Sequence, residues 1–228
     1  MTAKVITIAQ QKGGAGKTTL AAQLAVGFVC ARARVATIDI DPQASLSYWF
    51  AMRQKTLGDA NTITHQQLQG WRLRKEIQNL KSQGYDVILI DSPPHTQTDA
   101  TIAVREADLV LVPVQPSPMD IWACGETLRR ASAERVPALV VLNRINPRAG
   151  IFAQMVETLA QMQVDIATST LGNRVAFASS MLRGLGVAES ESSSHVAVQE
   201  IFDLVREIKR HKAIKTAPAT HAAPKRHS

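Results

Sequence analysis

The chain has 228 residues, of which 45% are hydrophobic and 20% charged, and its formal net charge is +7. The apolar content excludes a disordered chain, and 12 Gly and 10 Pro exclude a fibrous one. No run of about 18 apolar residues is present, which excludes a membrane-spanning helix. The two cysteines, Cys30 and Cys124, are too few for a disulfide framework. Length and composition favour one cytoplasmic globular domain.

Short apolar segments alternate along the chain with segments of helical periodicity. The predicted strands are 4–9, 35–40, 85–91, 109–114 and 138–143, and the predicted helices are 18–31, 68–83, 98–106, 119–133, 152–163 and 195–212. Strands of about six residues that alternate with helices are typical of βαβ units. We therefore expect an α/β fold, with a doubly wound, mostly parallel sheet. The domain should span residues 1–212, followed by a basic, disordered tail over residues 213–228.

A glycine-rich segment, QKGGAGKTT at residues 11–19, lies between the first predicted strand and the first predicted helix. A phosphate-binding loop needs glycines that turn backbone N–H groups inward, a helix N-terminus, a lysine for phosphate oxygens and a hydroxyl for Mg²⁺. The segment supplies all four. The predicted nucleotide-binding residues in it are Gly13, Gly14, Ala15, Gly16, Lys17, Thr18 and Thr19.

The start of this loop departs from the usual pattern. Gln11 replaces the first glycine, and an additional lysine, Lys12, precedes the glycine pair. Two interpretations are open. Lys12 is either a solvated loop lysine, or a lysine that reaches a triphosphate, such as that of a second subunit, and neutralises charge as an arginine finger does.

The string KGGAGKTT resembles the deviant Walker A motif of the ParA/MinD family of dimerising ATPases, and the resemblance runs from Val5 to about Lys209. The segment DIDPQ at 39–43 is similar to the D-x-D-P-Q of ParA-type members, and ILIDSPP at 88–94 to their Walker B strand and switch. The resemblance implies a P-loop NTPase that uses ATP and Mg²⁺, and a homodimer in which Lys12 acts across the interface.

Three residues are candidates for the metal site. Asp91 ends an apolar strand, where its carboxylate is well placed to hold Mg²⁺ through water, together with Thr18; the alternative is a carboxylate that caps the next turn. Asp39 is expected to support the water shell of the metal or to pair with a lysine.

The resemblance makes Asp41 the residue that orients the attacking water, with Lys12 and Lys17 as the other catalytic residues. Asp41-Pro42 also fits a helix N-cap followed by a helix-starting proline. Asn143 matches the position at which the family reads adenine with an amide, although a strand-end asparagine is also a common turn residue.

Most of the net charge lies near the C-terminal end. The segment from Arg206 to the end contains seven cationic residues and one anionic residue. Its net charge is therefore +6, which leaves a net charge of +1 for the preceding 205 residues. A basic tail favours a polyanion, either nucleic acid or an anionic lipid surface, while the alternative is a solvated tail. The candidate DNA contacts, each of which can also be an ordinary solvated cation, are Arg174, Arg183, Arg206, Lys209 and Arg210.

The resemblance favours a short ParA-like form, because only about nine residues precede the loop and no amphipathic membrane anchor follows Ile208. We expect its ATP-bound dimer to bind nonspecific double-stranded DNA and to lie on the nucleoid rather than a membrane. The dimer should partition or position a cargo, which is a plasmid, a chromosome origin or a protein assembly. A ParB-like or cargo adaptor protein would stimulate hydrolysis.

Other members of the superfamily provide alternatives. The main one is a MinD-like, membrane-associated positioning ATPase. An iron–sulfur ATPase requires paired cysteines in a glycine-rich setting, which Cys30 and Cys124 lack. A metabolic kinase or ligase leaves Lys12 unexplained.

Overall fold

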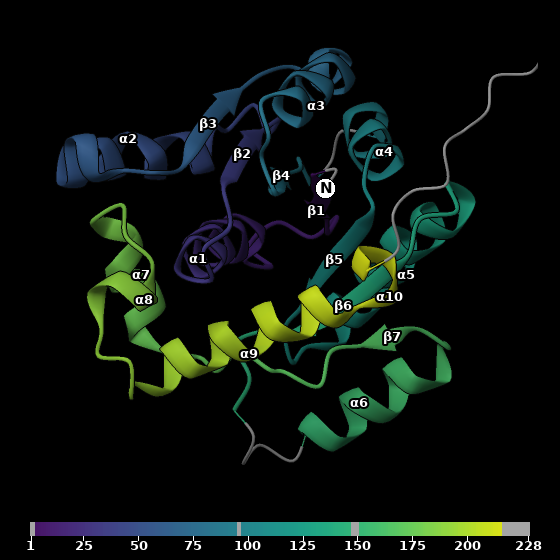
Figure 1. Ribbon diagram of the computed structural model, residues 1–228. Helices are drawn as coiled ribbons and strands as arrows, with labels where there is room; N and C mark the ends of the chain where they lie inside the picture. The colour runs from purple at the N-terminus through teal and green to yellow at the C-terminus, as the bar shows by residue number, and fades with distance from the viewer. Residues whose placement is uncertain (1–2, 95–96, 147–150, 216–228) are drawn as a thin grey trace, which may run out of the picture.

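The computed structural model describes residues 3–94, 97–146 and 151–215. Its strands form one parallel sheet in the order β3-β2-β4-β1-β5-β6-β7 (Figure 1). They are β1 (Lys4–Ile8), β2 (Val35–Asp39), β3 (Thr64–Gln67), β4 (Val87–Asp91), β5 (Leu109–Val114), β6 (Ala138–Leu142) and β7 (Asp165–Ile166). The predicted α/β fold with a parallel sheet is confirmed.

Helices cover both faces of this sheet. One face carries α1 (Lys17–Cys30), α2 (Ser45–Leu57), α7 (Val175–Leu182), α8 (Val187–Ser190) and α9 (Val196–Arg210). The other face carries α3 (Leu73–Ser82), α4 (Gln97–Arg105), α5 (Pro118–Ala133) and α6 (Ile151–Gln161). Successive strand residues point to opposite faces, so Ile6 joins the α1 core while Val5 joins the α3 core. Burial on both faces explains why these strands are almost entirely apolar.

The structure corrects the prediction around residues 45–83. The helix predicted over 68–83 begins only at Leu73, after β3 and a short 3₁₀ turn at Gly70–Arg72. β3 has the sequence THQQ and lies at the sheet edge, so it lacks the apolar pattern of a central strand. Helix α2 was missed because its buried face includes the charged Arg53.

The chain after α9 continues into a short helix, α10 (Lys212–Lys215). This helix covers the first residues of the predicted tail, and residues 216–228 lie outside the described part of the chain. No helix within the described ranges is both long and apolar enough to span a bilayer.

A buried ion pair joins α2 to α8. Arg53 is 1% exposed, and its Nη2 and Nη1 atoms lie 2.6 and 2.8 Å from the two carboxylate oxygens of Glu189. Its Nε donates to Asn61 Oδ1 at 2.8 Å. Gly184 packs against the backbone of Arg53 and has φ +67°. A Cβ on Gly184 would lie 2.1 Å from the backbone nitrogen of Arg53.

Replacing Gly184 with alanine should therefore destabilise the fold by about 3 kcal/mol or more, because the left-handed backbone and the overlap both cost free energy. The matched control is Gly84→Ala, which has φ +79° but only an ordinary 3.6 Å contact with Arg34. This control should cost only about 1–2 kcal/mol. Urea unfolding measures both values, and equal losses would contradict the expected clash.

Candidate nucleotide-binding site

The glycine-rich segment forms a loop between β1 and α1, at the carboxyl end of the sheet. Gly14 has φ +76° and Gly16 has φ +93°, conformations that strongly favour glycine. A Cβ on Gly16 would also lie 2.5 Å from Asn143 Nδ2. Helix α1 starts directly at Lys17, and its N-terminal N–H groups favour an anion there. The loop has the geometry expected of a phosphate site.

Side chains from the neighbouring strands hold the loop in place. Gln115, which follows β5, donates from Nε2 to the carbonyl of Gly14 at 2.6 Å. Asn143, which follows β6, donates from Nδ2 to the carbonyl of Ala15 at 3.0 Å. The role of Gln115 could not be predicted from the sequence, because Gln115 and Gly14 lie 101 positions apart and share no sequence motif.

The structure brings Lys17, Thr18 and Asp91 together beneath this loop. Thr18 Oγ1 donates to Asp91 Oδ2 at 2.6 Å. Burial raises the pKa of Asp91 to about 7. Burial also lowers the pKa of Lys17, against the opposing effect of the Asp91 and Asp41 carboxylates. Asp91 Oδ1 is buried and accepts no hydrogen bond from the described residues.

These atoms fit a magnesium ion. Mg²⁺ in nucleotide sites is usually held by one or two carboxylates or hydroxyls, with phosphates and water as the remaining ligands. Asp91 Oδ1 is an oxygen without a hydrogen-bond partner in the described part of the chain, and the Thr18 hydroxyl lies beside the same carboxylate. A bound cation would stabilise the ionised form of Asp91 and lower its pKa.

Asp39 ends β2, the neighbour of β4, and its carboxylate is engaged on both oxygens. Oδ1 accepts the backbone N–H of Asp41 at 3.0 Å. Oδ2 accepts both the backbone N–H and the hydroxyl of Ser47, each at 2.9 Å. Among the described residues no ion pair joins Asp39 to a lysine. The Asp39 carboxylate therefore connects two segments by hydrogen bonds: the turn that contains Asp41 and the first turn of α2.

Asp41 lies within this turn. Its Oδ1 accepts the backbone N–H of Gln43 at 2.9 Å, which is an Asx turn. The helix begins later, at Ser45, with Ala44 at the N-cap. The interpretation of Asp41 as a helix N-cap is thus wrong, because Asp39 rather than Asp41 supplies the acceptor for the first turn of α2.

Lys12 pairs with an aspartate of its own chain. Its Nζ contacts Oδ2 of Asp120 on α5. Asp120 is fully buried, its Oδ2 also accepts the hydroxyl proton of Ser117 at 2.9 Å, and its Oδ1 accepts no hydrogen bond from the described residues. Because 108 positions separate Lys12 from Asp120, this pair could not be predicted from the sequence.

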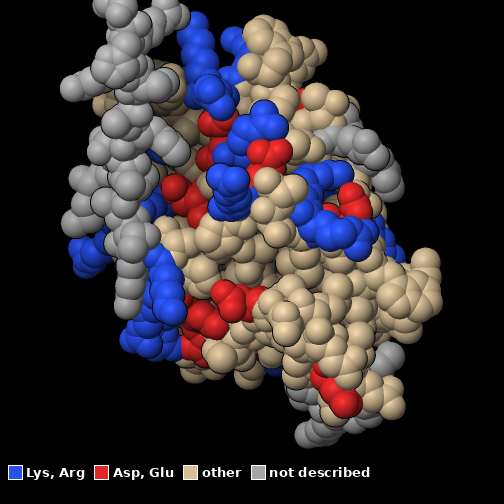
Figure 2. Space-filling view, turned by 90° about the vertical axis from the view of Figure 1, so that its right-hand side faces the viewer, with Lys and Arg blue, Asp and Glu red and all other residues tan. Residues whose placement is uncertain are grey.

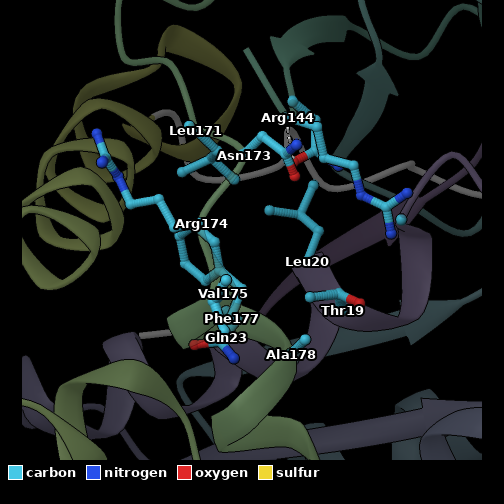
Figure 3. Close-up of a pocket in the computed structure, with 13 residues that line it drawn as sticks. Thr19, Leu20, Gln23, Arg144, Leu171, Asn173, Arg174, Val175, Phe177 and Ala178 are labelled. Atoms are coloured by element: carbon cyan, nitrogen blue, oxygen red, sulfur yellow. Dashed lines mark hydrogen bonds between the residues drawn. The ribbon is translucent and has the colours of Figure 1, made fainter. Parts of the chain in front are cut away.

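A cavity of 330 Å³ adjoins the loop (Figure 3). Its wall is partly apolar, with Leu20 and Phe177, and partly polar, with Thr19 and Asn173. Asn143 also lines it, while donating to the loop and accepting the backbone N–H of Arg144 at 2.9 Å. A contact between the Asn143 amide and adenine stays a prediction.

The five candidate DNA contacts do not form one patch. Arg174 makes a forked ion pair with Glu200, at 2.6 Å from Nη2 to Oε1, and lines the cavity. Arg206 pairs with Asp203. Arg183 follows α7, whereas Lys209 and Arg210 end α9 beside α10, and Figure 1 places α7 and α10 at opposite sides of the molecule.

Many basic side chains on another side of the molecule have acidic partners. Figure 2 shows the side that carries α4 and α5, where blue and red side chains lie next to one another. On the face of the sheet that carries these helices, Arg74 of α3 pairs with Glu106, which follows α4, and Arg105 of α4 pairs with Glu134, which follows α5. Exposed basic residues that form no ion pair within the described ranges include Lys209 and Arg210 at the end of α9.

Comparison with known proteins agrees with this geometry. The "Maintenance of carboxysome distribution protein A" of Halothiobacillus neapolitanus is 28% identical over 211 residues, or 89% of this chain and 95% of the relative. The ATP complex of a McdA variant from Cyanothece has a TM-score of 0.70 at 20% identity and covers 90% of this chain and 95% of its own. The Mg-ADP complex of MinD from Pyrococcus horikoshii has a TM-score of 0.72 at 20% identity and covers 91% and 96%. The model of the CobQ/CobB/MinD/ParA nucleotide binding domain matches residues 6–187, and the chain therefore belongs to this family of ParA- and MinD-like ATPases.

Proposed function

We propose that this protein is an ATPase that dimerises with ATP, binds nonspecific double-stranded DNA as a dimer and positions a cargo. The nucleotide part of this proposal rests on the Thr18–Asp91 pair beneath a glycine-rich loop, where one oxygen of the Asp91 carboxylate accepts no hydrogen bond from the residues that the structure describes. ATP and Mg²⁺ as cofactors are supported by the two similar structures, which contain ATP and Mg-ADP.

In the proposed reaction a water molecule attacks the γ-phosphorus of ATP, the bond to the ADP oxygen breaks, and inorganic phosphate leaves. Lys17 and the N-terminal N–H groups of α1 bind the phosphates, and Asp41 orients the water from the turn held by Asp39. Mg²⁺, held by Thr18 and Asp91, would neutralise charge on the β- and γ-phosphates.

The dimer depends on Lys12 in this proposal. Lys12 pairs with Asp120 within one subunit, and its side chain is 38% exposed. We propose that ATP draws Lys12 away from Asp120 and toward the phosphates of the second subunit. The change exchanges a carboxylate partner for a more highly charged triphosphate, which favours the dimer only while ATP is bound.

The cargo is proposed from the relatives. A protein that maintains carboxysome distribution covers most of this chain, which supports a protein assembly as the cargo. The relatives also include the "Probable plasmid-partitioning protein ParA" of Thermus thermophilus, 30% identical over 64% of this chain and 54% of the relative, which supports a plasmid as the second candidate. Hydrolysis stimulated by an adaptor protein would release the dimer from the nucleoid within the cytoplasm.

DNA binding is tested by filter retention of double-stranded DNA with ATP and Mg²⁺ at a series of salt concentrations. If the dimer neutralises about 6–8 phosphates, log K should fall against log salt with a slope of about −5 to −7. Lys209→Ala/Arg210→Ala should weaken binding and flatten the slope, because these side chains are exposed at the end of α9.

The matched control removes the same charge from helices α3 and α4. Arg74→Ala/Arg105→Ala lowers the net charge equally, but both side chains already pair with glutamates. Its binding should stay close to that of the native protein. Equal weakening by both double variants would place the DNA contact elsewhere. Flotation of the ATP-bound protein with anionic liposomes, without DNA retention, would support the MinD-like membrane alternative instead.

A further inference from the structure

A histidine that belongs to none of the sequence motifs lies next to the turn that carries Asp41, between Asp39 and Ser47. His65 is on the edge strand β3 and is half-buried, with its ring stacked on Phe50 at 4.8 Å between centroids. Its Nε2 lies 2.9 Å from the hydroxyl oxygen of Ser47. Its Nδ1 lies 3.0 Å from the hydroxyl oxygen of Thr37, which is fully buried on β2.

The directions of these hydrogen bonds follow from the Asp39 carboxylate, which lies next to the Ser47 hydroxyl. The Asp39 carboxylate only accepts, so the single hydroxyl proton of Ser47 goes to Asp39 Oδ2. Ser47 must then accept from His65, which places the ring proton on Nε2. Nδ1 consequently accepts from Thr37, whose single hydroxyl proton also lies within reach of the Thr64 carbonyl oxygen, at 3.3 Å from Oγ1. These four residues form a hydrogen-bond relay: Thr37 donates to His65, His65 donates to Ser47, and Ser47 donates to Asp39.

The last member of this relay controls the position of Asp41. Asp39 accepts the Asp41 backbone N–H with Oδ1 and Ser47 with Oδ2. The same carboxylate thus binds both ends of the turn that carries Asp41. Rotation of the Ser47 hydroxyl away from Asp39 would loosen this turn without changing any residue that touches the nucleotide.

We propose that His65 is a positioning residue for ATP hydrolysis: its Nε2–H directs the Ser47 hydroxyl onto Asp39 and so holds the Asp41 turn in the reactive position. This inference rests on the proposed function, in which Asp41 orients the attacking water. Burial lowers the pKa of His65 to about 4, so the ring is neutral near pH 7, as the relay requires.

The test replaces His65 with leucine, which has a similar size but no donor. ATP turnover should fall about tenfold, while the ATP dissociation constant changes less than twofold, because the phosphate loop is untouched. His65→Gln, which retains an N–H donor, should recover most of the loss. The control on the same strand is Gln66→Leu, at an exposed position, which should keep native turnover.

A double-mutant cycle shows whether His65 acts through Ser47. If it does, His65→Leu/Ser47→Ala should be no slower than Ser47→Ala alone. Independent losses that add in the double variant would overturn the relay. Hydrogen exchange provides a readout without nucleotide: amides in 39–47 should exchange about tenfold faster in His65→Leu, while amides of the central strands remain unchanged.

The outcomes separate this inference from the function on which it rests. Native turnover in His65→Leu together with an inactive Asp41→Ala would overturn the relay alone. Native turnover in Asp41→Ala would overturn the proposed reaction as well. If His65→Leu fails to fold, Thr37→Val carries the test, and unchanged exchange over 39–47 in that variant would contradict the relay.

Discussion

Asp41→Ala should bind ATP with nearly native affinity but hydrolyse it at least about 100-fold more slowly, and should accumulate as an ATP-bound dimer on DNA. Within the described residues, the Asp41 side chain makes no hydrogen bond to the phosphate loop, to Lys17 or to the Thr18–Asp91 pair. In the proposed mechanism, the variant therefore loses the group that orients water and retains the groups that bind phosphate. Single-turnover hydrolysis and sedimentation with ATP measure the two effects separately.

The control for this variant preserves the turn. Asp41 also accepts the backbone N–H of Gln43, so alanine removes an Asx turn as well as a charge. Asp41→Asn keeps an acceptor at that position and should be as slow as Asp41→Ala if the charge is what matters. Near-native hydrolysis in Asp41→Asn would mean that the residue acts through the turn, and near-native hydrolysis in Asp41→Ala would refute its assigned role.

Lys12→Ala should also be inactive, yet mixing it with inactive Asp41→Ala should restore about a quarter of native turnover. Half of randomly paired dimers are mixed, and each contains one complete site, which has Asp41 from one subunit and Lys12 from the other. Turnover of the mixture against each variant alone is the measurement. An inactive mixture, at concentrations where sedimentation shows mixed dimers, would mean that Lys12 acts within its own subunit.

The buried partner of Lys12 requires a second control. Lys12→Ala leaves the fully buried Asp120 carboxylate without its cation, which destabilises the fold by about 1–3 kcal/mol. Lys12→Ala/Asp120→Asn removes both charges and should regain stability but not hydrolysis. Asp120→Asn alone frees Lys12 and should strengthen ATP-dependent dimerisation. Unchanged or weaker dimerisation in Asp120→Asn would contradict the proposed exchange of partners.

The phosphate loop and the central strands could be predicted from the sequence because their signals are local. Gly16, Lys17 and Thr18 are adjacent in the chain, and a strand buried on both faces must be apolar throughout. The edge strand β3 and helix α2 could not be predicted, because the strand is polar and the buried face of the helix includes Arg53. Their stability comes from distant partners such as Glu189.

The sequence by itself determined that this chain has a parallel α/β fold with a nucleotide loop, since spacing within about ten residues defines both. Only the tertiary structure decided which side chains meet at the site: Asp120 with Lys12, Gln115 with the loop, and His65 with Ser47. Hydrogen bonds and ion pairs act over about 3 Å in space, whatever the separation along the chain. Residues on different strands and helices meet only after the sheet has placed their ends together.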